Sequence, residues 1–180
     1  MKLVLKWFVP ITLTAMALAW ISEQAALLLG FKPPPQDLVK LFTDPNVAWQ
    51  IKAKFAAIAV LLAPVIEELI FRMGLFRFCQ WCGRRIKKDQ GQRIKKDTDV
   101  AAGGFKMFLR SFPVISALVS GAVFAAVHFH AATFLPLWFL GVAFAWLYWK
   151  SGTVFSSMLC HFLFNLVNLV LCLVIGAEAV

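Results

Sequence analysis

The chain has 180 residues, of which 61% are hydrophobic and 15% are charged, against roughly 45–50% and 25% in globular domains. So large an apolar fraction excludes a disordered chain, and four Cys are too few for a disulfide-stapled small protein. A water-soluble domain of this length could not bury that much apolar surface, so the composition predicts a polytopic membrane protein.

The N-terminal part predicts one membrane helix and a connector. Residues 3–31 form an apolar run that is too long for the hydrophobic region of a signal peptide, so we expect an uncleaved helix. Residues 32–35, with the sequence Lys-Pro-Pro-Pro, stop any helix, and residues 36–46 are polar and turn-rich. We therefore separate residues 1–46, a transmembrane helix with its connector, from residues 47–180.

The second unit begins with an apolar run that is too long for one span. Residues 47–81 would extend over about 50 Å as a single helix. We expect Pro64 to divide this run and to lie in the first turn of its second half. Residues 82–110 then form a solvated basic loop.

Most of the positive charge is concentrated around that loop. Ten of the 18 Lys and Arg fall within residues 77–110 with only three Asp, so this segment carries +7 of the total charge of +9. The positive-inside rule places such a loop in the cytoplasm and requires no nucleic-acid partner.

Three further apolar runs follow, at residues 112–129, 134–149 and 154–175. The count is about five spans, which predicts an all-α transmembrane helical bundle without a β-sheet. The basic segments place the N-terminus in the cytoplasm and the C-terminus outside. We expect an integral, multi-pass protein of a bacterial cytoplasmic (inner) membrane, with the lipid bilayer as its constant partner.

Polar side chains inside these runs are the functional candidates, because a charge within a span costs roughly 2.5–3.5 kcal/mol on insertion scales. Glu68 and Arg72 lie four residues apart and can pair along one helix face. Glu67 is rotated away from that face and requires a partner on another helix. The remaining candidates lie in two later runs: His128, His130, His161, Asn165 and Asn168.

The last run carries its polar residues on one side. His161, Asn165 and Asn168 fall at i, i+4 and i+7 and form a single stripe along a helix. Such a stripe must face protein or a wet cavity rather than lipid.

A carboxylate, two His and an Asn that converge in a bundle favour hydrolytic chemistry. Glu67, hydrogen-bonded to His128, could hold and deprotonate a water molecule. His161 and Asn165 could donate hydrogen bonds to the oxyanion that forms when this water attacks a carbonyl group. One alternative remains open, a zinc-dependent membrane hydrolase in which Glu67, His128 and His161 are the metal ligands.

Three motifs carry a resemblance to a known family. The segment 64–75, PVIEELIFRMGL, resembles the Glu-Glu-x-x-x-Arg motif of the CPBP (ABI) family of intramembrane glutamic endopeptidases, which includes CAAX prenyl protease 2. The segment from Phe124 to His128 resembles the family's Phe-x-x-x-His motif, and that from His161 to Asn165 resembles its His-x-x-x-Asn motif. The motifs occur in order, within residues 55–176.

The resemblance implies that residues 47–180 are the catalytic core of an intramembrane endopeptidase with no metal or other cofactor. It implies four catalytic residues, of which two activate the water and two form the oxyanion hole: Glu67 and His128, then His161 and Asn165. It gives supporting roles to Glu68, Arg72 and Phe124. The substrate would be a membrane-embedded or membrane-anchored protein. A non-proteolytic immunity or scaffold protein of the same fold remains an alternative.

Overall fold

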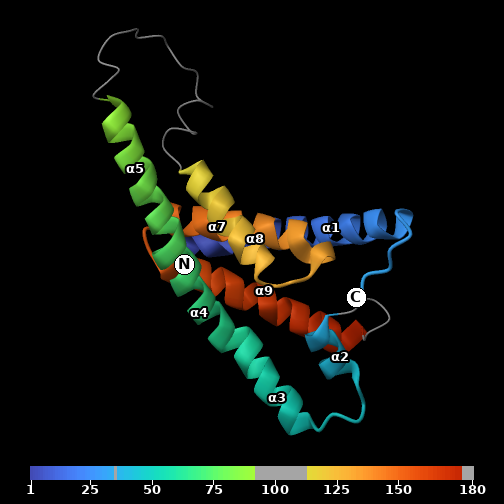
Figure 1. Cartoon of the computed structure of the whole chain (residues 1–180). Coiled ribbons are helices and arrows are strands. Elements are labelled where there is room, and N and C mark those ends of the chain that lie inside the picture. The colour runs from blue at the N-terminus through green and yellow to red at the C-terminus, as the bar shows by residue number, and fades with distance from the viewer. Residues whose placement is uncertain (35, 92–112, 176–180) are drawn as a thin grey trace.

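The computed structural model describes residues 1–34, 36–91 and 113–175, and within these ranges the chain is helical and has no β-strand (Figure 1). The predicted all-α helical bundle is therefore confirmed. The helices, in chain order, are α1 (Lys2–Leu28), α2 (Asp37–Thr43), α3 (Trp49–Ala57), η1 (Ile58–Leu62), α4 (Ala63–Glu68), η2 (Leu69–Phe76), α5 (Arg77–Gly91), α7 (Val114–Ala126), η3 (Ala131–Thr133), α8 (Phe134–Ser151) and α9 (Val154–Ile175).

The first helix, α1, ends before the proline run that was expected to stop it. The Gly30 N–H donates to the Leu27 carbonyl at 3.0 Å, and the Phe31 N–H donates to the Ala26 carbonyl at 2.9 Å. This way of closing a helix requires a residue in the left-handed conformation, and Gly30 has a φ of +76°. Gly30, rather than the prolines, therefore ends the helix.

The elements α3, η1, α4, η2 and α5 follow one another without a break from Trp49 to Gly91 and form the long rod of Figure 1. The predicted division at Pro64 is wrong, although Pro64 does lie in the first turn of α4. A proline lacks a backbone donor and crowds the turn before it. Here that turn is η1, a wider π-helical turn, which accommodates the ring without ending the helix.

The end of the rod corrects a second expectation. α5 continues to Gly91, so the predicted basic loop is wrong for residues 82–91, and its remainder, residues 92–110, lies outside the described residues. Lys, Arg and Gln are good helix formers, and the first half of the predicted loop contains no proline. The Arg85 guanidinium also lies 4.8 Å from the centre of the Trp81 ring, one turn earlier, a favourable cation–π contact.

Helix α8 is the centre of the bundle, since it packs against α7, α1 and α9. Its closest crossing is with α7, where a Cβ added to Gly141 would lie 2.6 Å from the Cα of Gly121. Only glycine permits so close an approach of two backbones. Gly152, with φ of +72°, then turns the chain sharply from α8 into α9.

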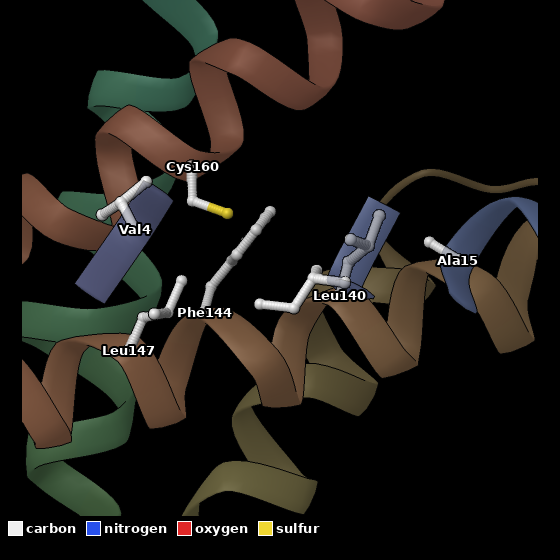
Figure 2. Packing of buried hydrophobic residues seen from close by; sticks show 7 residues of the cluster. Val4, Ala15, Leu140, Phe144, Leu147 and Cys160 are labelled. Atoms are coloured by element: carbon white, nitrogen blue, oxygen red, sulfur yellow. The ribbon is translucent and has the colours of Figure 1, made fainter. Parts of the chain in front are cut away.

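The apolar core joins α1, α8 and α9. Figure 2 shows side chains of the three helices meeting around Phe144. On α8 the contributing residues fall at helical spacing, Leu140, Phe144 and Leu147, and Cys160 of α9 packs against them. The N-terminal helix is therefore packed into the same core as the helices that carry the sequence motifs.

Three helices in the described part of the chain are long and apolar enough to cross a membrane: Lys2–Leu28, Ala131–Ser151 and Val154–Val174. A shorter apolar helix, Val114–Ala126, and the rod from Trp49 to Gly91 contain the other two predicted spans. These features indicate an integral membrane protein.

Candidate active site

The predicted polar residues meet in one cavity of about 770 Å³ inside the bundle. Parts of α1, α2, η1, α4, α8 and α9 line it, together with the end of α7 and the segment that follows. Seven of the candidate residues lie in its wall: Glu67, Phe124, His128, His130, His161, Asn165 and Asn168. The predicted stripe on the last helix therefore faces a cavity and not lipid.

Glu67 lies on α4 and is one of the polar groups in the cavity wall. Its side chain is 26% exposed, and its Oε2 atom is buried without a hydrogen-bond partner. The nearest ionisable group is His161 of α9, whose Nε2 lies 3.7 Å from Oε2. This distance is longer than a direct hydrogen bond, so His161 does not engage the Glu67 carboxylate, and the exposed part of the side chain faces the cavity.

Glu68, the next residue, is entirely enclosed. Arg72 donates to it through Nη2 at 3.2 Å, and the Nε of Arg72 lies 3.0 Å from the Glu68 Oε2. Both side chains have no exposed surface. The predicted pairing of Glu68 with Arg72 is confirmed.

Arg72 also donates to the hydroxyl of Ser120 on α7 at 3.4 Å, and that hydroxyl donates to the carbonyl of Phe71 at 2.9 Å. These contacts form a closed polar cluster of Glu68, Arg72 and Ser120.

His161 links the closed cluster to the cavity. Its Nδ1 lies 3.2 Å from the Glu68 Oε1, so the Nδ1–H donates to the carboxylate and Nε2 is turned toward Glu67. The ring stacks on Phe144 with centroids 4.8 Å apart, and the edge-to-face distance to Phe124 is 5.7 Å. One carboxylate and two aromatic rings thus fix the orientation of this imidazole.

His128 does not form the predicted hydrogen bond with Glu67. Its Nδ1 instead donates to the carbonyl of Phe124, one turn earlier on α7, at 2.8 Å. A neutral imidazole with its proton on Nδ1 has a lone pair on Nε2, so His128 can accept a proton in the cavity. The two residues line the same cavity from different helices, but α7 orients His128 through its own backbone.

Asn165 is held by the rod. Its Nδ2 donates to the carbonyl of Ala59 in the π-helical turn η1 at 2.9 Å. One amide hydrogen is thereby used between helices, and the second remains for the cavity. Asn168 is exposed and donates to the carbonyl of Phe164 on its own helix at 2.8 Å.

Phe124, predicted as a supporting residue, lies between the other site residues. Its ring makes edge-to-face contacts with Phe71 at 5.3 Å and with His128 at 4.9 Å. The Arg72 guanidinium lies 5.3 Å from the centre of the ring, a favourable cation–π geometry. Phe124 therefore separates the closed polar cluster from the cavity.

Sequence reasoning missed three contributions to the site. Ser120 has a signal, because Ser116 and Ser120 are polar residues four apart in an apolar run. Phe144 has none, because it is one of many aromatic residues in its run. The third is the cavity wall formed by the N-terminal part, including Met16 of α1 and Phe42 of α2. Helices that precede all three motifs give no local sign that they line the same site.

The zinc alternative requires at least three metal-binding side chains in one place. In the described ranges no three His, Cys, Asp or Glu side chains are grouped closely enough to hold a metal ion. Of the three proposed ligands, only Glu67 and His161 approach one another, with Oε2 and Nε2 3.7 Å apart.

The fold and the cavity define a membrane-embedded helical protein with a carboxylate, imidazoles and an amide around an internal site. The sequence model of one family, described as type II CAAX prenyl endopeptidase Rce1-like, matches residues 49–167. The chain therefore belongs to the Rce1-like family, and the resemblance drawn from the three motifs is confirmed. No curated protein and no solved structure matches the chain. The family supports a protease that acts on membrane-associated proteins within the lipid bilayer.

Proposed function

We propose that this protein is a glutamic intramembrane endopeptidase that hydrolyses a peptide bond of a membrane-embedded or membrane-anchored protein. One observation carries the proposal. Of two adjacent glutamates, Glu68 is fully enclosed in an ion pair with Arg72, whereas the Glu67 side chain is 26% exposed and lines a cavity that also contains His128, His161 and Asn165. This is the arrangement that a water-activating carboxylate needs.

In the proposed reaction the cavity holds a water molecule between Glu67 and His128. The carboxylate of Glu67 or the Nε2 of His128 takes a proton from the water as its oxygen attacks the carbonyl carbon of the substrate. The C–O bond forms, the carbonyl π electrons move onto the oxygen, and a tetrahedral intermediate results. Breakage of the C–N bond then returns the proton to the leaving amine.

The oxyanion of the intermediate is stabilised from α9. The second amide hydrogen of Asn165 can donate to it, because the first is already engaged with Ala59. His161 donates from Nε2 when its ring carries both protons, since Nδ1 is engaged by Glu68. Each such donor contributes about 10²–10³ in rate in enzymes that use an oxyanion hole.

The first test measures hydrolysis by the purified full-length protein. The substrates are two internally quenched reporters in lipid nanodiscs: a farnesylated CAAX peptide and a single-span transmembrane peptide. We expect the wild-type protein to cleave at least one of them and the Glu67→Ala variant to lose at least about 100-fold in kcat. Glu23→Ala, which removes an exposed carboxylate of α1, is the matched control and keeps full activity.

Three outcomes would contradict the proposal. Full activity of a folded Glu67→Ala variant would exclude Glu67 as the base. Loss of wild-type activity on treatment with a chelator, with recovery on addition of Zn²⁺, would favour the zinc hydrolase. Cleavage of neither reporter by the wild-type protein would favour a non-proteolytic scaffold or immunity role.

We further propose a multi-pass topology in a bacterial cytoplasmic membrane, with the basic segment inside. The cavity lies in the half of the bundle where α1 ends and α8 begins, away from the turn at Gly152 that joins α8 to α9. With Arg77, Arg84 and Arg85 of α5 in the cytoplasm, the cavity opens toward the opposite leaflet.

Cysteine labelling of intact cells tests this orientation in a variant that lacks the four native Cys. We expect a membrane-impermeant maleimide to label Asn46→Cys in intact cells, and Gly83→Cys only after lysis. The reverse pattern would place the opening on the cytoplasmic side, from which CAAX substrates would approach.

A further inference from the structure

The segment between α7 and α8 contains an unusual residue at the edge of the cavity. Phe129 has a φ of +52° and is the only non-glycine residue with a positive φ in the ranges that the structure describes. The residue is 94% exposed, although its side chain is a large apolar ring. Bulky residues avoid this backbone conformation, because Cβ approaches the following carbonyl oxygen.

The turn itself does not require a phenylalanine. The two other left-handed positions among the described residues, Gly30 and Gly152, also follow helix ends, and both are glycine. Phe129 closes α7 in the same manner, with its N–H donating to the carbonyl of Ala126 at 3.1 Å. The ring is not packed into the core, so burial within the protein does not offset the backbone strain.

The neighbours of Phe129 place this residue at the edge of the cavity. On one side, the Nδ1 of His128 is bonded to the carbonyl of Phe124 at 2.8 Å. On the other side, the Nε2 of His130 is bonded to the carbonyl of Pro34, in the connector between α1 and α2, at 2.9 Å. Both flanking residues are thus fixed, and Phe129 lines the same cavity as they do.

We propose that Phe129 is a specificity-determining residue that contacts an apolar side chain of the substrate next to the peptide bond that is cleaved. The inference rests on the proposed function. Two features support it: a strained backbone at a position where glycine would suffice, and an exposed apolar residue at the edge of the cavity that no other part of the described chain covers. Backbone strain of this kind clusters at active sites and ligand-binding positions, where it is retained for function.

The proposal predicts that stability and substrate binding change in opposite directions. Phe129→Gly relieves the strain, so we expect Tm to rise by about 2–4 °C. The same change removes the ring, so kcat/KM should fall by about tenfold, mainly through a higher KM. Phe129→Leu keeps an apolar side chain, so its kcat/KM should fall less than that of Phe129→Gly. Phe31→Ala removes another exposed ring outside the cavity and is the matched control, with unchanged KM.

The experiment compares these variants on reporters that carry Leu, Ala or Ser after the cleaved bond. The reporters are built on the nanodisc peptide that the wild-type protein cleaves fastest. We expect the kcat/KM of Phe129→Gly to fall most on the Leu reporter and least on the Ser reporter. An unchanged KM on all three reporters, or an equal fall in kcat/KM on all three, would overturn the proposal. Glu67→Ala is measured in parallel, because its loss of kcat tests the proposed function independently of any change in KM at Phe129.

Discussion

The closed polar cluster and the cavity lie side by side, and each receives one of two consecutive glutamates. Glu68 has no exposed surface and is bonded by Arg72 and His161, whereas the Glu67 side chain is 26% exposed in the cavity wall and its nearest ionisable partner lies 3.7 Å away. The two residues are chemically identical and about 100° apart on the helix. The helices that face each carboxylate therefore decide whether it stabilises the fold or remains available for chemistry.

His161 shows how the two regions depend on each other. One ring nitrogen contacts the Glu68 carboxylate and the other is turned to Glu67, so the closed cluster orients a group of the cavity. A change in the closed cluster should therefore affect stability first and activity second, and a change in the cavity should affect activity alone. The following predictions test this division, from the largest expected effect to the smallest.

Removal of the buried cation should have the largest effect on stability. Arg72→Met leaves the Glu68 carboxylate buried without its cation. Loss of one member of a buried ion pair lowers the free energy of unfolding by about 3–5 kcal/mol. The double variant Glu68→Gln with Arg72→Met should recover much of this loss, because no charge then remains buried. Reversible unfolding in mixed detergent micelles measures both.

An exposed ion pair provides the control for that prediction. Lys40 and Asp37 are 3.0 Å apart on the surface of α2, and Lys40→Met should leave the unfolding curve unchanged. If Arg72→Met were as stable as Lys40→Met, the closed cluster would have no structural role.

Loss of the proposed oxyanion donor should have a smaller effect, on activity. Asn165→Ala should lower kcat by about 100-fold with little change in KM, because its amide acts on the transition state. Asn168→Ala is the matched control, since this amide lies in the same cavity wall but is bonded to its own helix, and it should change kcat less than threefold. Equal losses in the two variants would show that Asn165 only joins α9 to η1.

The smallest effect is expected at the crossing of α7 and α8. Gly141→Ala brings a methyl group to within 2.6 Å of the Gly121 Cα, so the helices must separate, at a cost of about 1–3 kcal/mol. Since α7 carries Ser120 and Phe124, kcat should fall as well. Gly83→Ala, which has open space around the added Cβ, should not destabilise the protein. Destabilisation by both variants would indicate that helix propensity, and not the crossing, is being measured.

Features that depend on spacing within one helix could be predicted from the sequence. The Glu68–Arg72 pair and the stripe of His161, Asn165 and Asn168 follow from the 3.6-residue period, and the structure shows both. The apolar runs likewise predicted the helical bundle. In each case the geometry is set by local backbone hydrogen bonds.

Features that depend on how helices face one another could not be predicted in this way. The nearest ionisable partner of Glu67 is His161 and not His128, because α9 packs against α4. The continuation of the rod through Pro64 depends on a π-helical turn, which the hydrophobic pattern does not reveal. The contribution of α1 and α2 to the cavity likewise depends on packing across the bundle.

The central claim, that two adjacent glutamates have separate roles, is tested most directly by replacing each with its isostere. The measurement is kcat and Tm of Glu67→Gln and Glu68→Gln, determined side by side in the same nanodiscs on the same reporter. The account predicts that Glu67→Gln keeps the wild-type Tm and has a kcat at least about 100-fold lower. Glu68→Gln should have a lower Tm than the wild-type protein and a higher kcat than Glu67→Gln. A Glu67→Gln variant with wild-type kcat, or a Glu68→Gln variant that is fully stable and inactive, would contradict it.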